Sequence, residues 1–180
     1  EGEVIDVQKP VPDLTVAHIR PLKGAIKVGT PYHQETDSEL RALTARNHTA
    51  THMLQWALRE VLGKHVKQSG SLVQPDLLRF DFTHFQPMTP AEIKKVEDLI
   101  NEKIWRPSPV AKQEMKKDEA IAAGAIAMFG EKYGERVRVV SVGDYSVELC
   151  GGTHVSNSAE INLFKIANES GIAAGVRRII

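Results

Sequence analysis

The fold is decided by the stretch from Asp37 to Gly63, which reads DSELRALTARNHTATHMLQWALREVLG. Its apolar residues recur three or four positions apart, which is the spacing that lines one face of an α-helix. Thr36, Asp37 or Ser38 can cap the first turn of this helix, and a glycine such as Gly63 commonly stops one. We therefore predict a long helix over residues 37–62.

The residues before this helix contain short runs of β-type side chains separated by proline and glycine. The runs lie at residues 4–7, 14–19 and 26–28. Short strands with such turns between them indicate a small barrel or sheet. We therefore predict two domains: an N-terminal β subdomain over residues 1–36, in the form of a truncated barrel, and a core over residues 37–180.

A second long helix is predicted to begin after Thr89, because the segment Thr89-Pro90-Ala91-Glu92 combines three start signals. The threonine hydroxyl and the glutamate three residues later can satisfy free backbone N–H groups reciprocally. Pro90 suits the first helical position, since its missing N–H would be unpaired there in any case. Pro107 then marks the end of the helix.

Strands account for most of the remaining core. They are predicted at residues 80–82, 110–115, 137–142, 146–149, 163–166 and 176–179, with a Gly/Ser turn at residues 69–71 and a short helix at residues 118–123. Strands mixed irregularly with two long helices are typical of an α+β fold whose sheet is largely antiparallel. We predict one antiparallel sheet packed with the two long helices.

Composition narrows the possible classes of function. Hydrophobic residues make up 42% of the 180 residues, enough for a good-sized core, but no run approaches the roughly 20 apolar residues of a membrane helix. The 23 basic and 23 acidic residues balance, unlike in a protein whose main task is to grip nucleic acid backbone. We expect a soluble, cytoplasmic protein with no membrane partner and only local nucleic-acid contacts. Because it starts at Glu1 and ends in what looks like a strand cut short, we expect it to be part of a longer protein.

Four side chains form the clearest chemical pattern in the sequence. His48 and His52 lie four residues apart on the predicted helix, so their rings project from the same face one turn apart. Much later, Cys150 stands four residues before His154, with a Gly-Gly pair that lets the backbone turn sharply so that both side chains can converge. A thiolate with three imidazoles is a ligand set that zinc favours. We predict a zinc site between helix and sheet.

Alternatives remain open for this cluster. Cys150 could be a core thiol at the end of a strand, with His154 capping a turn. If zinc binds, four tight protein ligands imply a structural role, whereas a catalytic zinc keeps one position for water or substrate. A ligand that sits back would make the site catalytic, and His154 and Cys150 are the candidates.

Six segments, in this order along the chain, resemble the editing domain of alanyl-tRNA synthetases. They are residues 46–52 (RNHTATH), 68–73 (QSGSLV), 78–82 (LRFDF), 129–134 (FGEKYG), 148–154 (ELCGGTH) and 171–179 (GIAAGVRRI). Free-standing alanyl-tRNA editing proteins and the editing domain of threonyl-tRNA synthetases share the two metal motifs. However, the segments at 129–134 and 171–179 are similar to the alanyl synthetase specifically. The predicted N-terminal strands fit the small barrel that precedes this domain in the family.

The resemblance implies a hydrolase that removes serine or glycine wrongly attached to tRNA(Ala). Its partners would be the acceptor end of tRNA(Ala) and the remainder of the parent synthetase. Two other interpretations stay open: a zinc-stabilised tRNA-binding module without activity, and a threonyl-type editing domain. The zinc ligands that the resemblance implies are His48, His52, Cys150 and His154, and the editing-site residues are Thr51, Gln68 and Arg177.

Each of these three editing-site residues also has an ordinary structural explanation. Thr51 could pair with the hydroxyl of serine and be left unpaired by alanine, or it could bond the carbonyl four residues back in its own helix. Gln68 could hold ribose or water, or it could be a loop amide that faces solvent. Arg177 and Arg178 point to opposite faces of a strand, and the family position favours Arg177. Three histidines without a partner motif are interpreted as structural or solvated, namely His33, His65 and His84.

Overall fold

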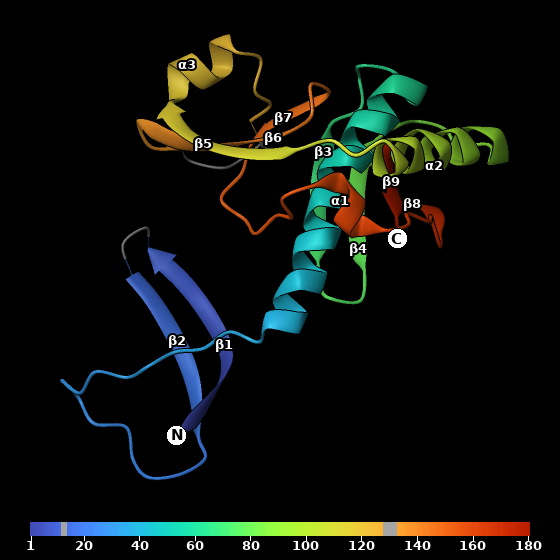
Figure 1. Cartoon of the computed structure of the whole chain (residues 1–180). Coiled ribbons are helices and arrows are strands. Elements are labelled where there is room, and N and C mark those ends of the chain that lie inside the picture. Colours follow the sequence, from blue (N-terminus) through green and yellow to red (C-terminus); the bar gives the residue numbers. More distant parts are fainter. Residues whose placement is uncertain (12–13, 128–132) are drawn as a thin grey trace. The chain divides into compact units, whose positions relative to one another are not determined.

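The computed structural model describes three stretches of the chain, residues 1–11, 14–127 and 133–180. The chain divides into two compact units, Glu1–Thr36 and Asp37–Ile180 (Figure 1). Most of the FGEKYG segment, residues 129–132, lies outside the described stretches. Within those stretches, no helix combines the length and the apolar character needed to cross a membrane.

The first unit contains an antiparallel hairpin of two strands, β1 (Gly2–Val11) and β2 (Leu14–Pro21). Nearly all side chains described in this unit are exposed, because two strands alone enclose no interior. The described residues of this unit therefore close no barrel, and they form the small sheet that the same pattern also allowed. The strand predicted at residues 26–28 is wrong, since these residues form no strand.

Helix α1 spans Ser38–Leu62, as the apolar spacing predicts. Asp37 caps it, because its Oδ1 accepts hydrogen bonds from the backbone N–H groups of Glu39 and Leu40, at 2.9 and 3.0 Å. Gly63 ends it with a φ of 114°, a backbone conformation that residues with a Cβ rarely adopt. Both predicted ends of the helix are confirmed.

Helix α2 spans Pro90–Trp105 and begins with the predicted capping box. The Thr89 hydroxyl accepts a hydrogen bond from the N–H of Glu92 at 3.2 Å, and the Glu92 carboxylate accepts one from the N–H of Thr89 at 2.7 Å. These bonds satisfy donors that the first turn of a helix leaves free. The helix packs against α1.

The second unit has two antiparallel sheets, where the sequence predicted one (Figure 1). The first has the order β3-β4-β9-β8, with strands β3 (Gln68–Val73), β4 (Leu78–Thr83), β8 (Glu169–Ala173) and β9 (Val176–Ile179). The second has the order β5-β6-β7, with strands β5 (Val110–Lys116), β6 (Arg136–Val142) and β7 (Ser146–Leu149). The short helices are α3 (Lys117–Ala122) and the 3-10 turn η1 (Ser158–Ile161). The predicted α+β class is confirmed.

Helix α1 contacts both sheets of the second unit. Buried side chains hold the helix and the two sheets together. The larger core cluster includes Leu54, Phe80, Ile100 and Val140, from α1, β4, α2 and β6, and each of them is 0% exposed. A smaller cluster packs α3 against β6 and β7. Burying a large apolar side chain contributes about 1.5–3 kcal/mol. The position of α1 relative to both sheets is therefore fixed by packing.

Residues 69–71 are the middle of β3 and not the predicted turn. The register of β3 against β4 shifts between Gln68 and Gly70, as in a β-bulge. Glycine and serine are typical of turns, but glycine is also common where a strand is bulged. The turn predicted at residues 69–71 is therefore wrong, because glycine and serine occur in a bulged strand as well as in a turn.

Residues 163–166 form no strand, although their apolar character predicts one. Side chains of α2 take the place of a neighbouring strand. Asn101 exchanges two hydrogen bonds of 2.9 Å with the backbone of Phe164, and Glu97 Oε1 accepts one from the N–H of Ile166 at 2.8 Å. These backbone groups are thus satisfied without a sheet.

Asp81 of β4 and Arg178 of β9 form a bidentate ion pair across the first sheet, with distances of 2.7 and 2.9 Å. The hydrogen bonds from Arg178 are the main cause that lowers the pKa of Asp81. Because the folded-state pKa is depressed, the pair stabilises the fold fully above the unfolded-state pKa of about 3.9. That stabilisation is lost as the pH falls through the lower, folded-state pKa.

We predict that Asp81→Asn lowers the urea midpoint of unfolding at pH 7, and that its difference from wild type shrinks once the pH falls below about 3.9. Urea unfolding followed by circular dichroism at a series of pH values measures this. The control is Asp76→Asn, which changes an exposed carboxylate in the β3–β4 loop and should give the wild-type profile. Equal midpoints for wild type and Asp81→Asn at pH 7 would show that the pair does not stabilise the fold.

Candidate metal centre

Four side chains from two distant parts of the chain converge beside the C-terminal end of β7. His48 and His52 come from adjacent turns of α1, Cys150 directly follows β7, and His154 lies in the loop after it. Their ligand atoms all lie within 4.8 Å of one another. The Sγ of Cys150 lies 3.4 Å from Nε2 of His48 and 3.3 Å from Nε2 of His154. The four side chains could hold one metal ion.

The surroundings favour the neutral form of all three imidazoles. Burial lowers the pKa of His52 to about 3, and the nearby His48 adds to this shift. Burial is also the main cause that lowers the pKa of His48 and of His154. A neutral imidazole has a free nitrogen lone pair, which is the form that binds a metal ion.

Thr49 fixes the ring of His154 from the buried side. Its hydroxyl donates to the carbonyl of Ala45 at 3.0 Å and accepts from the N–H of Val155 at 3.3 Å. The same oxygen lies 3.1 Å from Nδ1 of His154. Because the hydroxyl proton of Thr49 is used in the bond to Ala45, the hydroxyl oxygen acts as an acceptor toward His154. The Nδ1 of His154 therefore carries the proton and donates it in this bond. The Nε2 of His154 is then free to face the cluster.

The other two rings differ in their outer contacts. The backbone of Thr153 hydrogen-bonds the His48 ring. The Nδ1 of His52 lies 3.7 Å from Oε2 of Glu148, which is too long for a hydrogen bond. Burial raises the pKa of Glu148 to about 8, against the opposing effect of a hydrogen bond from Ser146. Outer partners of this kind orient metal-binding rings.

Two cations from the second sheet hold the loop that carries Cys150 and His154. Arg138 of β6 donates through Nη1 to the carbonyl oxygens of Cys150, at 3.3 Å, and of Gly152. Lys112 of β5 donates to the carbonyl oxygen of His154 at 2.9 Å. The position of the loop therefore depends on β5 and β6 as well as on its own residues.

Gly152 has a spatial role and not the conformational one that the sequence suggested. Neither Gly151 nor Gly152 has a positive φ, so the pair does not supply a glycine-specific turn. A Cβ at position 152 would overlap the ring of His48, whereas a Cβ at position 151 would have no neighbour within 4 Å. The ring of His48 thus packs directly on the backbone of Gly152.

Thr51 is buried in α1 next to His52. Its hydroxyl donates to the carbonyl of Asn47 at 2.8 Å, which is the intrahelical bond that the sequence left open as an alternative. A hydroxyl that donates one hydrogen bond still has lone pairs that can accept another. The bond to Asn47 is therefore compatible with an additional partner.

Gln68 and Arg177 lie in one row across the first sheet, since each is paired in register with Phe82 of β4. Gln68 donates to the hydroxyl of Ser71 at 3.1 Å. Arg177 makes two hydrogen bonds to Glu169, at 2.6 and 2.8 Å. Among the described residues, the side-chain hydrogen bonds of Gln68 and Arg177 go to these sheet residues and not to the four ligand side chains.

Three histidines outside the cluster, namely His33, His65 and His84, have partners that the sequence did not indicate. Nε2 of His65 lies 3.0 Å from Nδ1 of His84, and their rings are stacked. Nε2 of His33 lies 3.0 Å from a carboxylate oxygen of Glu35. His65 and His84 are 19 residues apart, on either side of the β3–β4 hairpin, so spacing alone carried no signal for this pair.

Sequence reasoning missed Thr49, Glu148 and Arg138 as parts of this centre. Two of them had a usable signal. Thr49 lies three residues before His52 and so shares its helix face, and Glu148 lies two residues before Cys150, which strand alternation places on the same side. Arg138 reaches the loop only through the pairing of β6 with β7, which no local pattern predicts.

We predict that Gly152→Ala weakens the binding of Co²⁺ to the chain roughly tenfold or more, because the added methyl group displaces the His48 ring. Titration with Co²⁺ followed by visible absorption measures this. Gly151→Ala makes the same chemical change one residue earlier, where there is open space, and should bind as the wild type does. Equal affinities for the two variants would contradict the packing argument.

Comparison with known proteins identifies the family. Residues 137–180 match the family described as the threonyl and alanyl tRNA synthetase second additional domain. The alanine–tRNA ligases of Streptococcus mutans and Desulfitobacterium hafniense are 52% and 54% identical to this chain over 179 residues, and that of Oceanobacillus iheyensis is 53% identical over 176 residues. These alignments cover 98–99% of this chain and 20% of each relative, so the chain spans about one fifth of their length. The chain therefore corresponds to a segment of alanyl-tRNA synthetases, and its residues 137–180 match the second additional domain.

Proposed function

We propose that this chain is the editing domain of an alanyl-tRNA synthetase, which hydrolyses the ester that joins serine or glycine to tRNA(Ala). The observation that carries the proposal is the convergence of His48, His52, Cys150 and His154 in a chain of this family. Hydrolysis of an aminoacyl ester requires an attacking water and stabilisation of an oxyanion, and a metal centre suits both requirements.

The donor atoms fit a zinc ion. Bonds of about 2.0–2.3 Å at tetrahedral angles separate ligand atoms by roughly 3.3–3.6 Å. Two of the three sulfur–nitrogen distances of the cluster, from Cys150 to His48 and to His154, are 3.4 and 3.3 Å and agree with this spacing. One thiolate and three neutral imidazoles are also ligands that zinc prefers. When bound, zinc supplies a Lewis acid that can polarise the ester carbonyl or the attacking water.

Burial indicates the side from which a substrate approaches. His48 and Cys150 are half-buried, whereas His52 and His154 are buried. The aminoacyl end of the tRNA therefore reaches the cluster from the side of His48 and Cys150. Two of the four side chains are candidates for ligands that could leave the metal ion and free a position for water or substrate. His154 is held in place by Thr49, whereas Cys150 lies on the accessible side. Cys150 is therefore the better candidate.

The need for a second site follows from the size of the amino acids. A pocket built for alanine cannot exclude the smaller glycine, and it penalises the extra hydroxyl of serine only weakly. A site that removes serine must spare alanine. In the proposed site, the Thr51 hydroxyl directs its proton to Asn47 and accepts a hydrogen bond from the hydroxyl of serine. Alanine offers no such donor.

Gln68 and Arg177 are proposed to bind the ribose or phosphate of the acceptor end. Arg177 uses Nε and Nη2 for Glu169. Its Nη1 lies over Gly171, where an added Cβ would come within 2.8 Å of it. Nη1 remains available for a phosphate or carbonyl oxygen, and the missing side chain of Gly171 lets the guanidinium lie directly over the backbone. Together with Gln68, it would hold the substrate from the first sheet.

We further assign residues 37–180 as the editing core and residues 1–36 as the N-terminal β subdomain that joins it to the rest of the synthetase. The balanced charge of the chain, 23 basic and 23 acidic residues, supplies little general attraction for RNA. The remainder of the synthetase therefore contributes most of the affinity for tRNA.

A closed, structural zinc is the alternative that four protein ligands favour. The chain would then be a zinc-stabilised tRNA-binding module without hydrolytic activity. A threonyl-type editing domain is the second alternative, because the matching family description names threonyl as well as alanyl synthetases. Activity on differently charged tRNAs separates these functions.

We expect the chain to release serine and glycine from tRNA(Ala), to spare alanine, and to lose this activity when its metal is chelated. Release of labelled amino acid from each charged tRNA measures the activity, with zinc added back as a control. Serine on tRNA(Thr) is the test substrate for the threonyl alternative. A folded, zinc-loaded chain that cleaves none of these esters, alone or within a longer synthetase, would refute the proposal and favour a structural zinc.

We predict that Thr51→Val lowers kcat/KM for serine release by about 5–150-fold, which corresponds to the loss of about 1–3 kcal/mol for a hydrogen bond at a buried site. Glycine release should change little, because glycine has no hydroxyl to lose a partner. Thr44→Val is the matched control, since Thr44 makes the same type of intrahelical bond, to the carbonyl of Leu40 at 2.8 Å. A parallel loss for serine and glycine would rule out recognition of the serine hydroxyl by Thr51.

A further inference from the structure

One ring nitrogen of the metal centre lacks a hydrogen bond. The Nδ1 of His52 is buried and has no hydrogen-bond partner among the described residues. A buried polar atom left unpaired destabilises the fold, because it loses its hydrogen bond to water and gains none in return. The nearest carboxylate oxygen, Oε2 of Glu148, is 3.7 Å away, so a shift of less than about 1 Å would complete a hydrogen bond.

Glu148 is built into the fold with one oxygen free. The residue is 3% exposed, and its Oε1 accepts a hydrogen bond of 3.1 Å from the hydroxyl of Ser146. It lies in β7 two residues before Cys150, so strand alternation places both side chains on the side of the sheet that faces α1. Oε2 is therefore left for His52.

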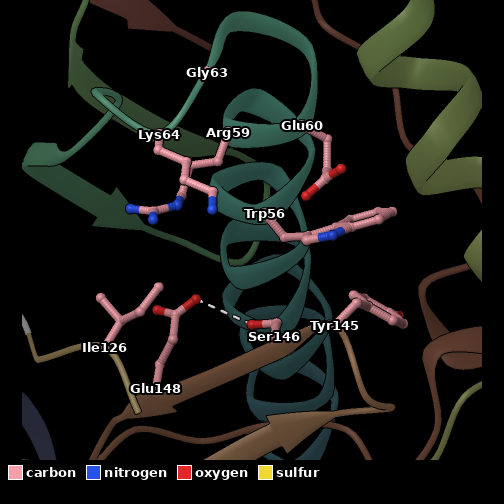
Figure 2. A pocket seen from close by; sticks show the side chains of 9 residues that line it. All are labelled: Trp56, Arg59, Glu60, Gly63, Lys64, Ile126, Tyr145, Ser146 and Glu148. Atoms are coloured by element: carbon pink, nitrogen blue, oxygen red, sulfur yellow. Dashed lines mark hydrogen bonds between the residues drawn. The ribbon is translucent and has the colours of Figure 1, made fainter. Parts of the chain in front are cut away.

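The carboxyl group of Glu148 also borders a cavity of about 440 Å³ rather than close-packed core. Figure 2 shows Glu148 and Ser146 on one side of this cavity, with Arg59 and Lys64 on the other and the aromatic ring of Trp56 beside them. Space next to the carboxyl group allows it to rotate without displacing other side chains. The carboxyl group therefore has room to change its orientation, and a hydrogen bond to His52 requires only such a change.

We propose that Glu148 is a positioning residue of the metal centre, which accepts a hydrogen bond from Nδ1–H of His52 and thereby directs the Nε2 lone pair of this ring toward the metal ion. The inference rests on the metal-binding part of the proposed function and not on hydrolysis. Carboxylate partners of metal-binding histidines fix the tautomer and orientation of the ring and raise its basicity.

The three histidines then have outer partners of different kinds. The rings of His48 and His154 bond neutral groups, the backbone of Thr153 and the hydroxyl of Thr49. Among the described residues, His52 is the one of the three rings that faces a carboxyl group. A carboxyl group can accept a hydrogen bond whether it is ionised or protonated, so Glu148 can satisfy the buried Nδ1–H of His52. Loss of Glu148 should therefore weaken metal binding.

The test measures zinc affinity by competition with a chromogenic chelator, together with the visible spectrum of the Co²⁺-loaded chain. We expect Glu148→Ala to lower zinc affinity about 10–100-fold and to alter the cobalt ligand-field bands, while the cysteine-to-cobalt charge-transfer band persists. Glu148→Gln should stay within a few-fold of wild type, since its amide oxygen can accept the same hydrogen bond.

Glu97→Ala is the control for the loss of a buried carboxylate elsewhere. Glu97 accepts a hydrogen bond from the backbone of Ile166, away from the metal ligands, so this variant should lose stability and keep its metal affinity. If Glu148→Ala binds zinc as tightly as wild type, or no more weakly than Glu97→Ala, the inference is wrong. A wild-type chain that binds no metal would overturn the proposed function together with this inference.

A second measurement needs no variant. Long-range ¹H–¹⁵N NMR of the zinc-loaded wild-type chain reports which nitrogen of each histidine carries a proton. We expect His52 to be protonated at Nδ1 and metal-bound at Nε2. Metal bound at Nδ1 of His52 would overturn the inference even if zinc binding itself is tight.

Discussion

The packing of α1 against both sheets is the interaction on which the metal centre depends. The helix provides His48 and His52, and the second sheet delivers the other two ligands through the loop after β7. A shift of α1 by one residue would move each ring by about 1.5 Å and rotate it by about 100°. Metal–ligand bonds tolerate only about 0.2 Å. The apolar core therefore determines whether the four donor atoms can meet, and Arg138 holds the loop in the matching position.

Local signals in the sequence predicted the helices well and the sheets less well. Both ends of α1 and the capping box of α2 follow from residues adjacent in the sequence. Strand pairing depends on distant partners instead. Glycine and serine at residues 69–71 conceal a bulged strand, and the side chains of Asn101 and Glu97 remove the need for a strand at residues 163–166. The N-terminal hairpin shows the same limit, since two strands with turn signals do not reveal whether further strands close a barrel.

The convergence of the four candidate ligands could be predicted because each pair has short, regular spacing and the residue types are ones that zinc favours. The structure brings all four together. The roles of Thr51, Gln68 and Arg177 rest on family resemblance, and their observed bonds to Asn47, Ser71 and Glu169 do not decide them. The contacts around the four side chains, such as those of Thr49 with His154 and of Arg138 with Cys150, could not be predicted from sequence motifs. They join residues that only tertiary packing brings close.

The separation of the two ligand pairs along the chain affects when the site can form. His48 and Cys150 are 102 residues apart. At roughly 5–20 residues per second, the ribosome makes the cysteine about 5–20 seconds after the histidine pair. During this interval the nascent helix has two imidazoles but no thiolate, and the core that would hold them is unfinished. A site made of all four side chains can therefore form only after Cys150 and His154 have been synthesised and β7 has joined its sheet.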